Sequence, residues 1–304
     1  MSNLPAFLQN GDKIAIAAPA RKVTISELTP FIEFCRSHGL EVVYSDNLFA
    51  ALHQFAGSDE QRAADYQFWL DSSEVKAIIS AKGGYGTARI IDALDFTKFK
   101  LSPKWLIGFS DFTVIHSHVN SKFNIATMHA SMPAYLKADS GEDIQKSFLS
   151  LISVLKGEPF KYSIKPNPFS LPGNCKGVLV GGNLSVIYSI MGSASELNTE
   201  NCILFLEDLD EYLYHMDRMM VCLKRAGKLK NLRGILVGHM NSMHDNPIPF
   251  GQTIEEIIRE HTKDLGIPVY FGIDAGHLNP NFPLIFGAEV EIENNCLNFG
   301  QSPS

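Results

Sequence analysis

The sequence predicts an α/β protein made of two domains. Short apolar runs of strand length alternate with segments whose apolar residues recur at helical spacing, the pattern of parallel strands with helices on both faces. The length of 304 residues fits two domains of ordinary size. A cluster of prolines near the middle of the chain interrupts the alternation and predicts where the domains meet.

The predicted domain boundary follows from this proline-rich stretch. Because proline fixes φ and cannot donate a ladder hydrogen bond, Pro159 to Pro172 is expected to be a crossover or linker and not a core element. We therefore expect an N-terminal domain over 1–138, a helical and proline-rich linker over 139–173, and a C-terminal α/β domain over 174–304.

The first half contains apolar strand-like runs and segments with an apolar helix face. The predicted strands are 13–18, 40–44, 75–80 and 105–108. The predicted helices are 26–38, 59–71, 87–94 and 111–119. Gly39 directly follows the first helix and is expected to end it in a left-handed conformation.

The second half repeats the alternation after a helix predicted over 144–155. Its expected strands are 177–182, 202–206, 234–238 and 268–271. Its expected helices are 184–191, 216–226 and 253–262. The tail from 284 to 299 carries only short β-like runs.

The composition excludes several classes of protein. With 45% hydrophobic and 19% charged residues, the chain is expected to be globular and not disordered. The net charge of −7 argues against a general nucleic-acid binder. No run approaches the ~20 apolar residues of a membrane-spanning helix, and the N-terminal residues lack the basic start and apolar core of a secretory signal.

The cysteines predict a reducing compartment. Their odd number and wide spacing exclude the close cysteine pairs of common zinc sites and the Cys-x-x-Cys redox motif. We expect free thiols in a cytoplasmic protein. The five positions are 35, 175, 202, 222 and 296.

The sharpest local motif follows the predicted strand Trp105–Gly108. Ser110 comes two residues after Gly108, and a predicted helix starts at Asp111. A strand, a sharp turn and a helix form the setting of a nucleophile elbow, and the helix N-terminus suits a developing oxyanion. Phe112 stands where the elbow pattern has its second glycine, and an N-cap role for Ser110 or Asp111 remains an alternative.

A glycine-rich turn, Lys82-Gly-Gly-Tyr-Gly-Thr-Ala-Arg89, follows the predicted strand 75–80. Its backbone N–H groups could face a phosphate, an oxyanion or a substrate carboxylate. It is not a Walker A motif, and it lacks the last glycine of the dinucleotide-binding pattern. A tight turn that needs positive φ explains the glycines equally well.

Four carboxylates follow the predicted strand 202–206, namely Glu207, Asp208, Asp210 and Glu211. Most charge runs are solvated surface. Glu207 differs because it stands directly at the end of a strand, where parallel sheets build their sites. The spacing alone also leaves paired-carboxylate chemistry open.

His277 lies on a glycine-rich loop after the predicted strand 268–271, a setting that favours a functional role. Ser110, Glu207 and His277 all follow predicted strands. They also occur in the order serine, acid, histidine, which is one of the known orders of a catalytic triad. The first domain would supply the nucleophile and the second the acid and the base, across a cleft between them.

The other histidines give weaker indications of a functional role. His116 and His118 lie two positions apart on a predicted helix, so they face apart and would chelate one metal ion poorly. His239 and His244 could contribute to a metal site, and ordinary loop polarity is the alternative.

Together these motifs resemble the LD-carboxypeptidases, cytoplasmic serine peptidases that include microcin-immunity enzymes. The resemblance covers nearly the whole chain, in six motifs at 17–20, 82–89, 108–111, 181–184, 206–208 and 276–281. One stretch, Met128–Pro133, departs from the pattern. The family usually has a His-Gly-Pro-Met-like sequence there, whereas this chain has Ala130 and Ser131, which bears on the shape of that wall.

The resemblance implies a flavodoxin-like or class I amidotransferase-like parallel-sheet domain, followed by a smaller α/β domain. It implies a cytoplasmic homodimer that recycles cell-wall peptides. The bond cut would join the L-configured centre of a diamino acid to the terminal D-alanine of a murein tetrapeptide. The expected partner is thus a small peptide, with no nucleic acid, membrane or cofactor involved.

The resemblance also implies a role for each site residue. His277 would take the proton from Ser110, and Glu207 would orient and stabilise the imidazole. The backbone N–H groups of Gly84 and Asp111 would hold the oxyanion.

Tyr85 and Arg89 are the candidate substrate-binding residues. Arg89 would hold the terminal carboxylate of the substrate, and a surface or interdomain ion pair is the alternative for it. No metal is needed in this mechanism. Three alternatives remain open from the sequence: an immunity-type peptidase acting on acyl-sulfamoyl adenylates, a non-catalytic module for an anionic ligand, and a metal hydrolase built on His239 and His244.

Overall fold

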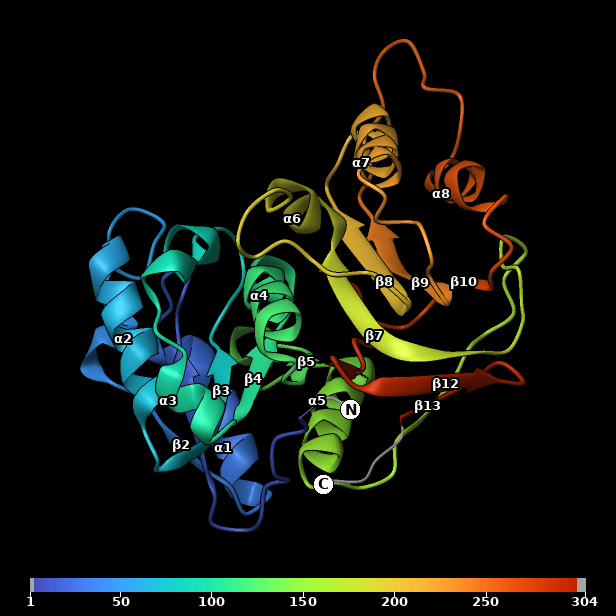
Figure 1. Ribbon diagram of the computed structural model, residues 1–304. Coiled ribbons are helices and arrows are strands. Elements are labelled where there is room, and N and C mark those ends of the chain that lie inside the picture. The colour runs from blue at the N-terminus through green and yellow to red at the C-terminus, as the bar shows by residue number, and fades with distance from the viewer. Residues whose placement is uncertain (1–2, 300–304) are drawn as a thin grey trace.

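The computed structural model describes residues 3–299 and contains two β-sheets (Figure 1). The N-terminal sheet has the strand order β11-β5-β4-β3-β1-β2. All of its neighbouring strands are parallel except β11, which pairs antiparallel with β5. The strands are β1 Lys13–Ala17, β2 Glu41–Val43, β3 Val75–Ser80, β4 Trp105–Gly108, β5 Thr127–His129 and β11 Leu284–Phe286.

Helices cover both faces of this sheet. They are α1 Ile25–Ser37, α2 Asp59–Asp71, α3 Thr97–Leu101, α4 Thr113–Phe123 and α5 Glu142–Leu155. Capping boxes begin α1 at Thr24 and α2 at Ser58, and Gly39, with φ of 77°, follows the end of α1 as predicted. In the described range 3–299, no helix combines the length and apolarity needed to cross a membrane.

The helix predicted over 87–94 is wrong. Two short 3₁₀ turns, Thr87–Arg89 and Ile91–Ala93, occupy this segment instead. The Thr87 N–H donates to the Asp111 carboxylate at 2.8 Å, so the chain here is held by a side chain from the next strand–helix unit. Local periodicity could not reveal that contact.

The C-terminal sheet is mixed, with the order β10-β9-β8-β7-β12-β13-β6. The strands β7 to β10 are parallel, and β12, β13 and β6 add an antiparallel extension. Its strands are β6 Lys161–Ser163, β7 Cys175–Asn183, β8 Cys202–Leu209, β9 Gly234–Asn241, β10 Val269–Phe271, β12 Glu289–Glu293 and β13 Cys296–Phe299. Its helices are α6 Leu184–Ser189, α7 Leu213–Arg225 and α8 Ile254–Thr262. The predicted two-domain α/β class is confirmed.

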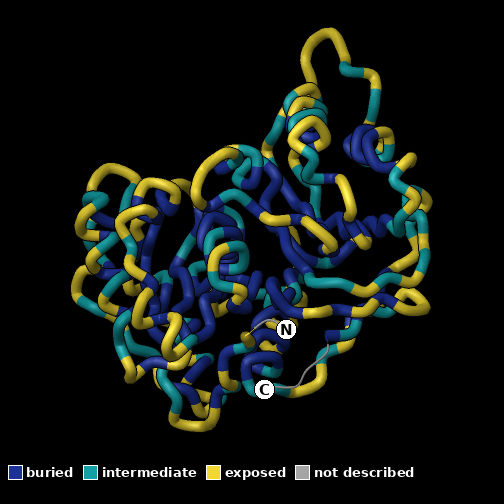
Figure 2. The backbone as a smooth tube through the Cα atoms, viewed as in Figure 1, coloured by how far each residue is buried: buried dark blue, intermediate teal, exposed yellow. Residues whose placement is uncertain are grey.

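One apolar cluster, the shared core, spans both halves, and each half has a further cluster on its sheet. Figure 2 shows buried backbone in both sheets. Ile107 of β4, Phe205 of β8 and Phe286 of β11 belong to the same buried cluster. The strand β11 comes from the part of the chain assigned to the C-terminal domain, yet it completes the N-terminal sheet. The predicted limits at 138 and 174 stay predictions.

The segment 139–173 contributes to this core. Phe148 of α5 is fully buried and lies with its ring 5.7 Å from that of Phe31 in α1. Tyr162 of β6 is also buried, and β6 pairs with β13. The expectation that the proline-rich stretch lies outside the core is therefore wrong for β6, because the prolines flank the strand and leave its ladder groups intact.

Candidate active site

Ser110 stands on a sharp turn between β4 and α4. Its φ is 62°, in the left-handed region that residues other than glycine rarely adopt. A 3₁₀ turn, Ser110–Phe112, leads directly into α4. Phe112 stands where the elbow pattern has its second glycine. Its ring is buried over Gly108, and a Cβ built on Gly108 would lie 2.7 Å from this ring. The local geometry is that of a nucleophile elbow.

The glycine-rich turn lies beside this serine. A Cβ built on Gly83 would lie 3.3 Å from Ser110 Cβ and 3.4 Å from its Oγ. Gly84 and Gly86 have φ of 113° and 153°, so the turn needs both of these glycines. Burial raises the pKa of the Asp111 carboxyl, although the hydrogen bond from Thr87 that fixes the turn opposes the shift. The N–H groups of Gly84 and Asp111 stay predicted oxyanion donors.

Glu207 and His277 form a short hydrogen-bonded pair. His277 Nδ1 lies 2.6 Å from Glu207 Oε2, and the Glu207 side chain is completely buried. The register between β8 and β9 shifts at Glu207, and such a bulge re-aims a side chain at the edge of a sheet. The other carboxylate oxygen of Glu207 has no partner among the described residues.

The pKa of His277 is raised above its ordinary value of 6.5. Burial acts to lower this pKa, but the charge and the hydrogen bond of Glu207, with a further contribution from Asp208, outweigh it. The pair therefore favours a protonated imidazole, which is the form a general base adopts after it accepts a proton.

Strand pairing explains how residues so distant in the sequence meet. Leu284 of β11 pairs with His129 of β5, and His129 pairs with Gly108 of β4. The end of the His277 loop therefore lies two strands, about 10 Å, from the start of the serine elbow. The His277 ring packs against Phe109, with centroids 4.9 Å apart. The Ser110 hydroxyl has no hydrogen bond to any described residue.

Hydrogen bonds from three directions hold the His277 loop. The N–H of Gly276 donates to Asn281 Oδ1 at 2.9 Å, and the N–H of Asn281 donates to Ser147 Oγ of α5 at 2.9 Å. The N–H of Leu278 donates to His239 Nδ1 at 3.0 Å. Sequence reasoning quoted Asn281 only as part of a motif and missed Ser147, because nothing local marks a helix serine as a loop anchor.

Comparisons with known proteins fit this geometry. The description "LD-carboxypeptidase N-terminal domain" matches residues 14–130, and "LD-carboxypeptidase C-terminal domain" matches residues 176–292. A Bacillus subtilis protein named "Probable murein peptide carboxypeptidase" is 32% identical over 290 residues, which cover 94% of this chain and 90% of that protein. The chain belongs to the LD-carboxypeptidase family.

Solved structures of the family share the fold. The muramoyltetrapeptide carboxypeptidase from Oxalobacter formigenes has a TM-score of 0.83 at 26% identity, with coverage of 96% of this chain and 100% of that one. The microcin C7 self-immunity protein MccF in complex with aspartyl sulfamoyl adenosine has a TM-score of 0.86 at 20% identity, with coverage of 100% and 99%. The second likeness concerns the fold alone.

In this LD-carboxypeptidase chain, the motif Gly181–Leu184 joins the two domains at the nucleophile helix. Thr113, the first residue of α4, accepts a hydrogen bond from the Asn183 N–H at 3.0 Å. Gly182 makes this approach possible, since a Cβ there would lie 2.4 Å from Thr113 Oγ1. Asn183 also donates to Asp208 at 2.9 Å, so Asp208 positions the interface while its neighbour Glu207 meets His277. Burial and Glu207 raise the pKa of Asp208 to about 7.

The two histidines considered for a metal site have separate partners. His239 Nδ1 accepts from Leu278, whereas His244 lies 2.5 Å from Asp210. Burial lowers the pKa of His239 to about 4, so its ring is neutral. Among the residues that the structure describes, no three or more His, Cys, Asp or Glu side chains gather as metal ligands. His239 is a loop-positioning residue in this structure.

His129 was missed by sequence reasoning as a site neighbour. It is fully buried, and its ring nitrogens make no hydrogen bond of good geometry to the described residues, although the Asn281 side chain lies close enough to act on its pKa. Burial, reinforced by neighbouring histidines, lowers its pKa well below the ordinary value. It packs against Phe109 and Phe205 as a neutral ring behind the elbow.

The two candidate substrate-binding residues lie on the exposed side of the glycine-rich turn. Tyr85 is half exposed and its ring lies 6.2 Å from that of Phe55. The guanidinium of Arg89 is engaged by Asp59, with Nε 2.9 Å from both carboxylate oxygens. Their contact with substrate stays a prediction.

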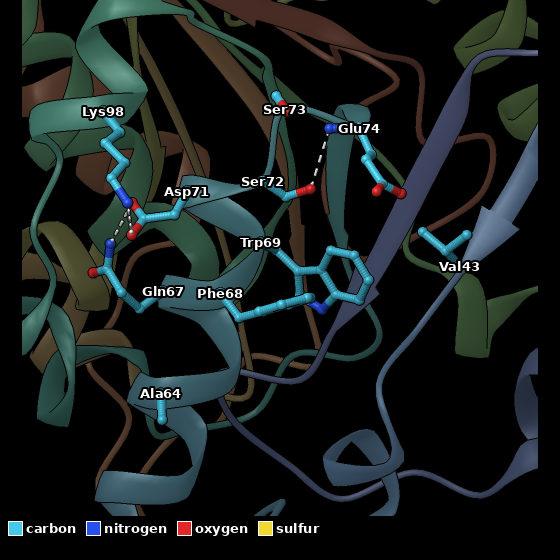
Figure 3. Close-up of a pocket in the computed structure, with 10 residues that line it drawn as sticks. All are labelled: Val43, Ala64, Gln67, Phe68, Trp69, Asp71, Ser72, Ser73, Glu74 and Lys98. Carbon is cyan, nitrogen blue, oxygen red and sulfur yellow. Dashed lines mark hydrogen bonds and ion pairs between the residues drawn. The ribbon is translucent and has the colours of Figure 1, made fainter.

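A cavity of about 820 Å³ lies elsewhere, between the end of α2 and the strands β2 and β3 (Figure 3). One acidic side chain of its lining is paired, since Asp71 accepts from Lys98 at 3.2 Å and from Gln67 at 3.0 Å. Figure 3 marks both contacts with dashed lines. It contains none of the candidate catalytic residues.

Proposed function

We propose that this protein is a serine LD-carboxypeptidase that removes the terminal D-alanine of murein tetrapeptides. The observation that carries the proposal is the buried Glu207–His277 pair, 2.6 Å apart, with the His277 ring packed on the residue before Ser110. A serine on a strained elbow beside an oriented imidazole is the arrangement of a triad hydrolase.

The reaction follows from the positions of these groups. His277 accepts the Ser110 proton through Nε2 while the serine oxygen attacks the scissile carbonyl carbon. Glu207 binds the Nδ1–H, fixes the tautomer and stabilises the imidazolium. His277 then protonates the D-alanine amine as it leaves, and water hydrolyses the acyl-enzyme by the same steps in reverse order.

The glycine-rich turn supplies the place for the negative charge. Gly83 lies against Ser110, so the next N–H along the turn, that of Gly84, is close to the attacked carbonyl. The N–H of Asp111 lies at the start of the 3₁₀ turn and of the α4 dipole. One such donor typically contributes ~2.7–4 kcal/mol to the transition state.

The substrate class rests on the names of relatives. The Bacillus subtilis and Oxalobacter formigenes proteins are named for murein peptides and muramoyltetrapeptides. Family membership and nearly full coverage support the same class for this chain. The homodimer and the cytoplasmic location stay predictions.

The direct test is incubation with the peptide L-Ala-γ-D-Glu-meso-diaminopimelate-D-Ala, followed by mass spectrometry. We expect tripeptide and free D-alanine in equal amounts, and fluorophosphonate labelling of the wild type but not of Ser110→Ala. Ser37→Ala, the same change on the exposed end of α1, is the matched control and should retain both.

Other outcomes distinguish the alternatives. Cleavage of an aminoacyl-sulfamoyl adenylate in place of the tetrapeptide would favour an immunity-type peptidase. Reversible ligand binding without labelling or turnover would favour a binding module, and both results contradict the proposal.

A further inference from the structure

Four cationic side chains surround the glycine-rich turn, and three of them are already paired with acids. The pairs are Lys82 with Glu27 at 2.8 Å, Arg89 with Asp59 at 2.7 Å, and Arg62 with Asp59. Arg62 also donates to the carbonyl oxygen of Gly86 at 3.0 Å, so it is part of the turn's internal support.

Arg21 is the fourth cation, and within residues 3–299 its guanidinium has neither an ion pair nor a hydrogen bond. It is exposed and follows β1 at the same edge of the sheet where β3 and β4 end. An unpaired guanidinium at this edge is available to a ligand.

The Arg21 side chain lies directly over Gly84. A Cβ built on Gly84 would meet Arg21 Nε at 2.4 Å and Cδ at 2.5 Å. Gly83, one residue earlier, is the glycine that contacts Ser110. Consecutive Cα atoms lie ~3.8 Å apart. The Arg21 guanidinium therefore lies about one residue length from Gly83, the glycine that contacts Ser110.

Tyr135 shows that Arg21 faces the site and not away from it. Its ring lies 5.4 Å from that of Phe109, which in turn packs on His277. Burial raises the pKa of Tyr135, the Arg21 charge opposes this shift, and Glu207 adds to it. Tyr135 is therefore close to the charges of both Arg21 and the triad acid.

An enzyme that removes only the last residue must recognise a chain end. The α-carboxylate of that residue lies about one residue length, ~3.8 Å, from the scissile carbonyl. Arginine suits this group because its planar fork can bind both carboxylate oxygens at once.

We propose that Arg21 binds the terminal α-carboxylate of the substrate and thereby restricts the enzyme to the last peptide bond. This inference rests on the proposed carboxypeptidase function. It assigns to Arg21 the role that the sequence suggested for Arg89, whose guanidinium is held by Asp59.

The test compares two tetrapeptides that differ only at the end, one with a free terminal D-alanine and one with D-alaninamide. For the wild type, we expect kcat/KM to favour the free acid by roughly 10- to 100-fold. Arg21→Gln should lose this preference by slowing cleavage of the acid, while kcat/KM for the amide stays within about twofold. Arg21→Lys should restore part of the preference.

Two controls separate this role from general charge effects. Arg36→Gln removes the same charge at the end of α1, on the opposite edge of the sheet, and should leave the acid-to-amide ratio unchanged. Arg89→Gln tests the assignment that the sequence suggested, and we expect it to change the ratio less than Arg21→Gln does.

The inference fails if Arg21→Gln keeps the wild-type ratio or if Arg89→Gln is the variant that loses it. In either case cleavage by the wild type would leave the carboxypeptidase proposal intact. A wild type that cleaves neither peptide would overturn both proposals.

Discussion

The proposed nucleophile, Ser110, and the proposed base, His277, are positioned in different ways. Ser110 is placed by its own neighbours in the sequence, since the strand, elbow and helix that position it all lie within 105–123. His277 is placed by residues far away in the chain, including Ser147, Glu207 and His239. The nucleophile therefore depends on local backbone geometry, and the base depends on tertiary hydrogen bonds.

The two sides also differ in their exposure to solvent. Ser110 is half-buried beside an exposed glycine turn, where substrate can reach it. Glu207 is fully buried and commits one oxygen to His277. Ser110 is therefore open to substrate, whereas the Glu207 carboxylate is shielded from water. Charge interactions are stronger away from water, so Glu207 acts strongly on His277.

The largest expected effect removes the nucleophile. Ser110→Ala should lower kcat for D-alanine release by at least about 10⁴-fold, because the attacking oxygen is lost. The hydroxyl makes no hydrogen bond to the described chain, so we expect an unchanged melting temperature by differential scanning calorimetry. A large loss of stability would show that the Ser110 side chain takes part in tertiary contacts and is not positioned by local backbone geometry alone.

The next largest effect is expected when Glu207, the proposed acid, is replaced while His277 is kept. Glu207→Gln should lower kcat by about 10³–10⁴-fold, since the amide cannot stabilise the imidazolium or hold the active tautomer. Ser110 labelling should become slow but remain detectable.

The pH profile sharpens the same point. Because the pKa of His277 is raised above 6.5, wild-type kcat/KM should fall as the pH drops through a value above 6.5, where the base becomes protonated. Glu207→Gln removes the charge that opposes the effect of burial on the His277 pKa. This pKa, and with it the acidic limb of the profile, should therefore move to lower pH. A limb that does not move would mean that Glu207 does not control the base.

A smaller effect is expected at the loop support. His239→Leu removes the acceptor for the Leu278 N–H and should lower kcat about tenfold through a misplaced His277. His239→Asn keeps an acceptor oxygen and should restore most of kcat. Equal loss in both variants would indicate a role beyond positioning.

The smallest effect is expected at Ser147, through which α5 supports the His277 loop. Ser147→Ala removes the acceptor for the Asn281 N–H and should cost about 1 kcal/mol of unfolding free energy, measured in urea, with a few-fold drop in kcat. Ser150→Ala, whose hydroxyl bonds only within α5, is the matched control and should leave kcat unchanged.

The same contrast explains what the sequence could predict. Most strands, most helices and the elbow at Ser110 are local patterns, and they were predictable. The sequence did not predict the short strands β5 and β6, which have only three residues each. The course of 87–94 was not, since Asp111 fixes Thr87 from another element. The return of β11 to the first sheet was not predictable either, because three apolar residues, Leu284–Phe286, carry no information about which sheet edge they cover.

The support of His277 was also beyond local reasoning. His239 looked like a possible metal ligand because its residue type and loop position were the only signals, and its true partner is a backbone N–H of a distant loop. Arg21 carried no motif at all, and only the glycine beneath it and the paired state of its neighbours make it stand out.

The crossing of β11 has a consequence for biosynthesis. A ribosome makes the N-terminal half first, so Ser110 emerges long before His277 and β11. Until Leu284–Phe286 pair with β5, that sheet has an open edge and the elbow has no base beside it. The proposed site is therefore complete only once this edge is closed.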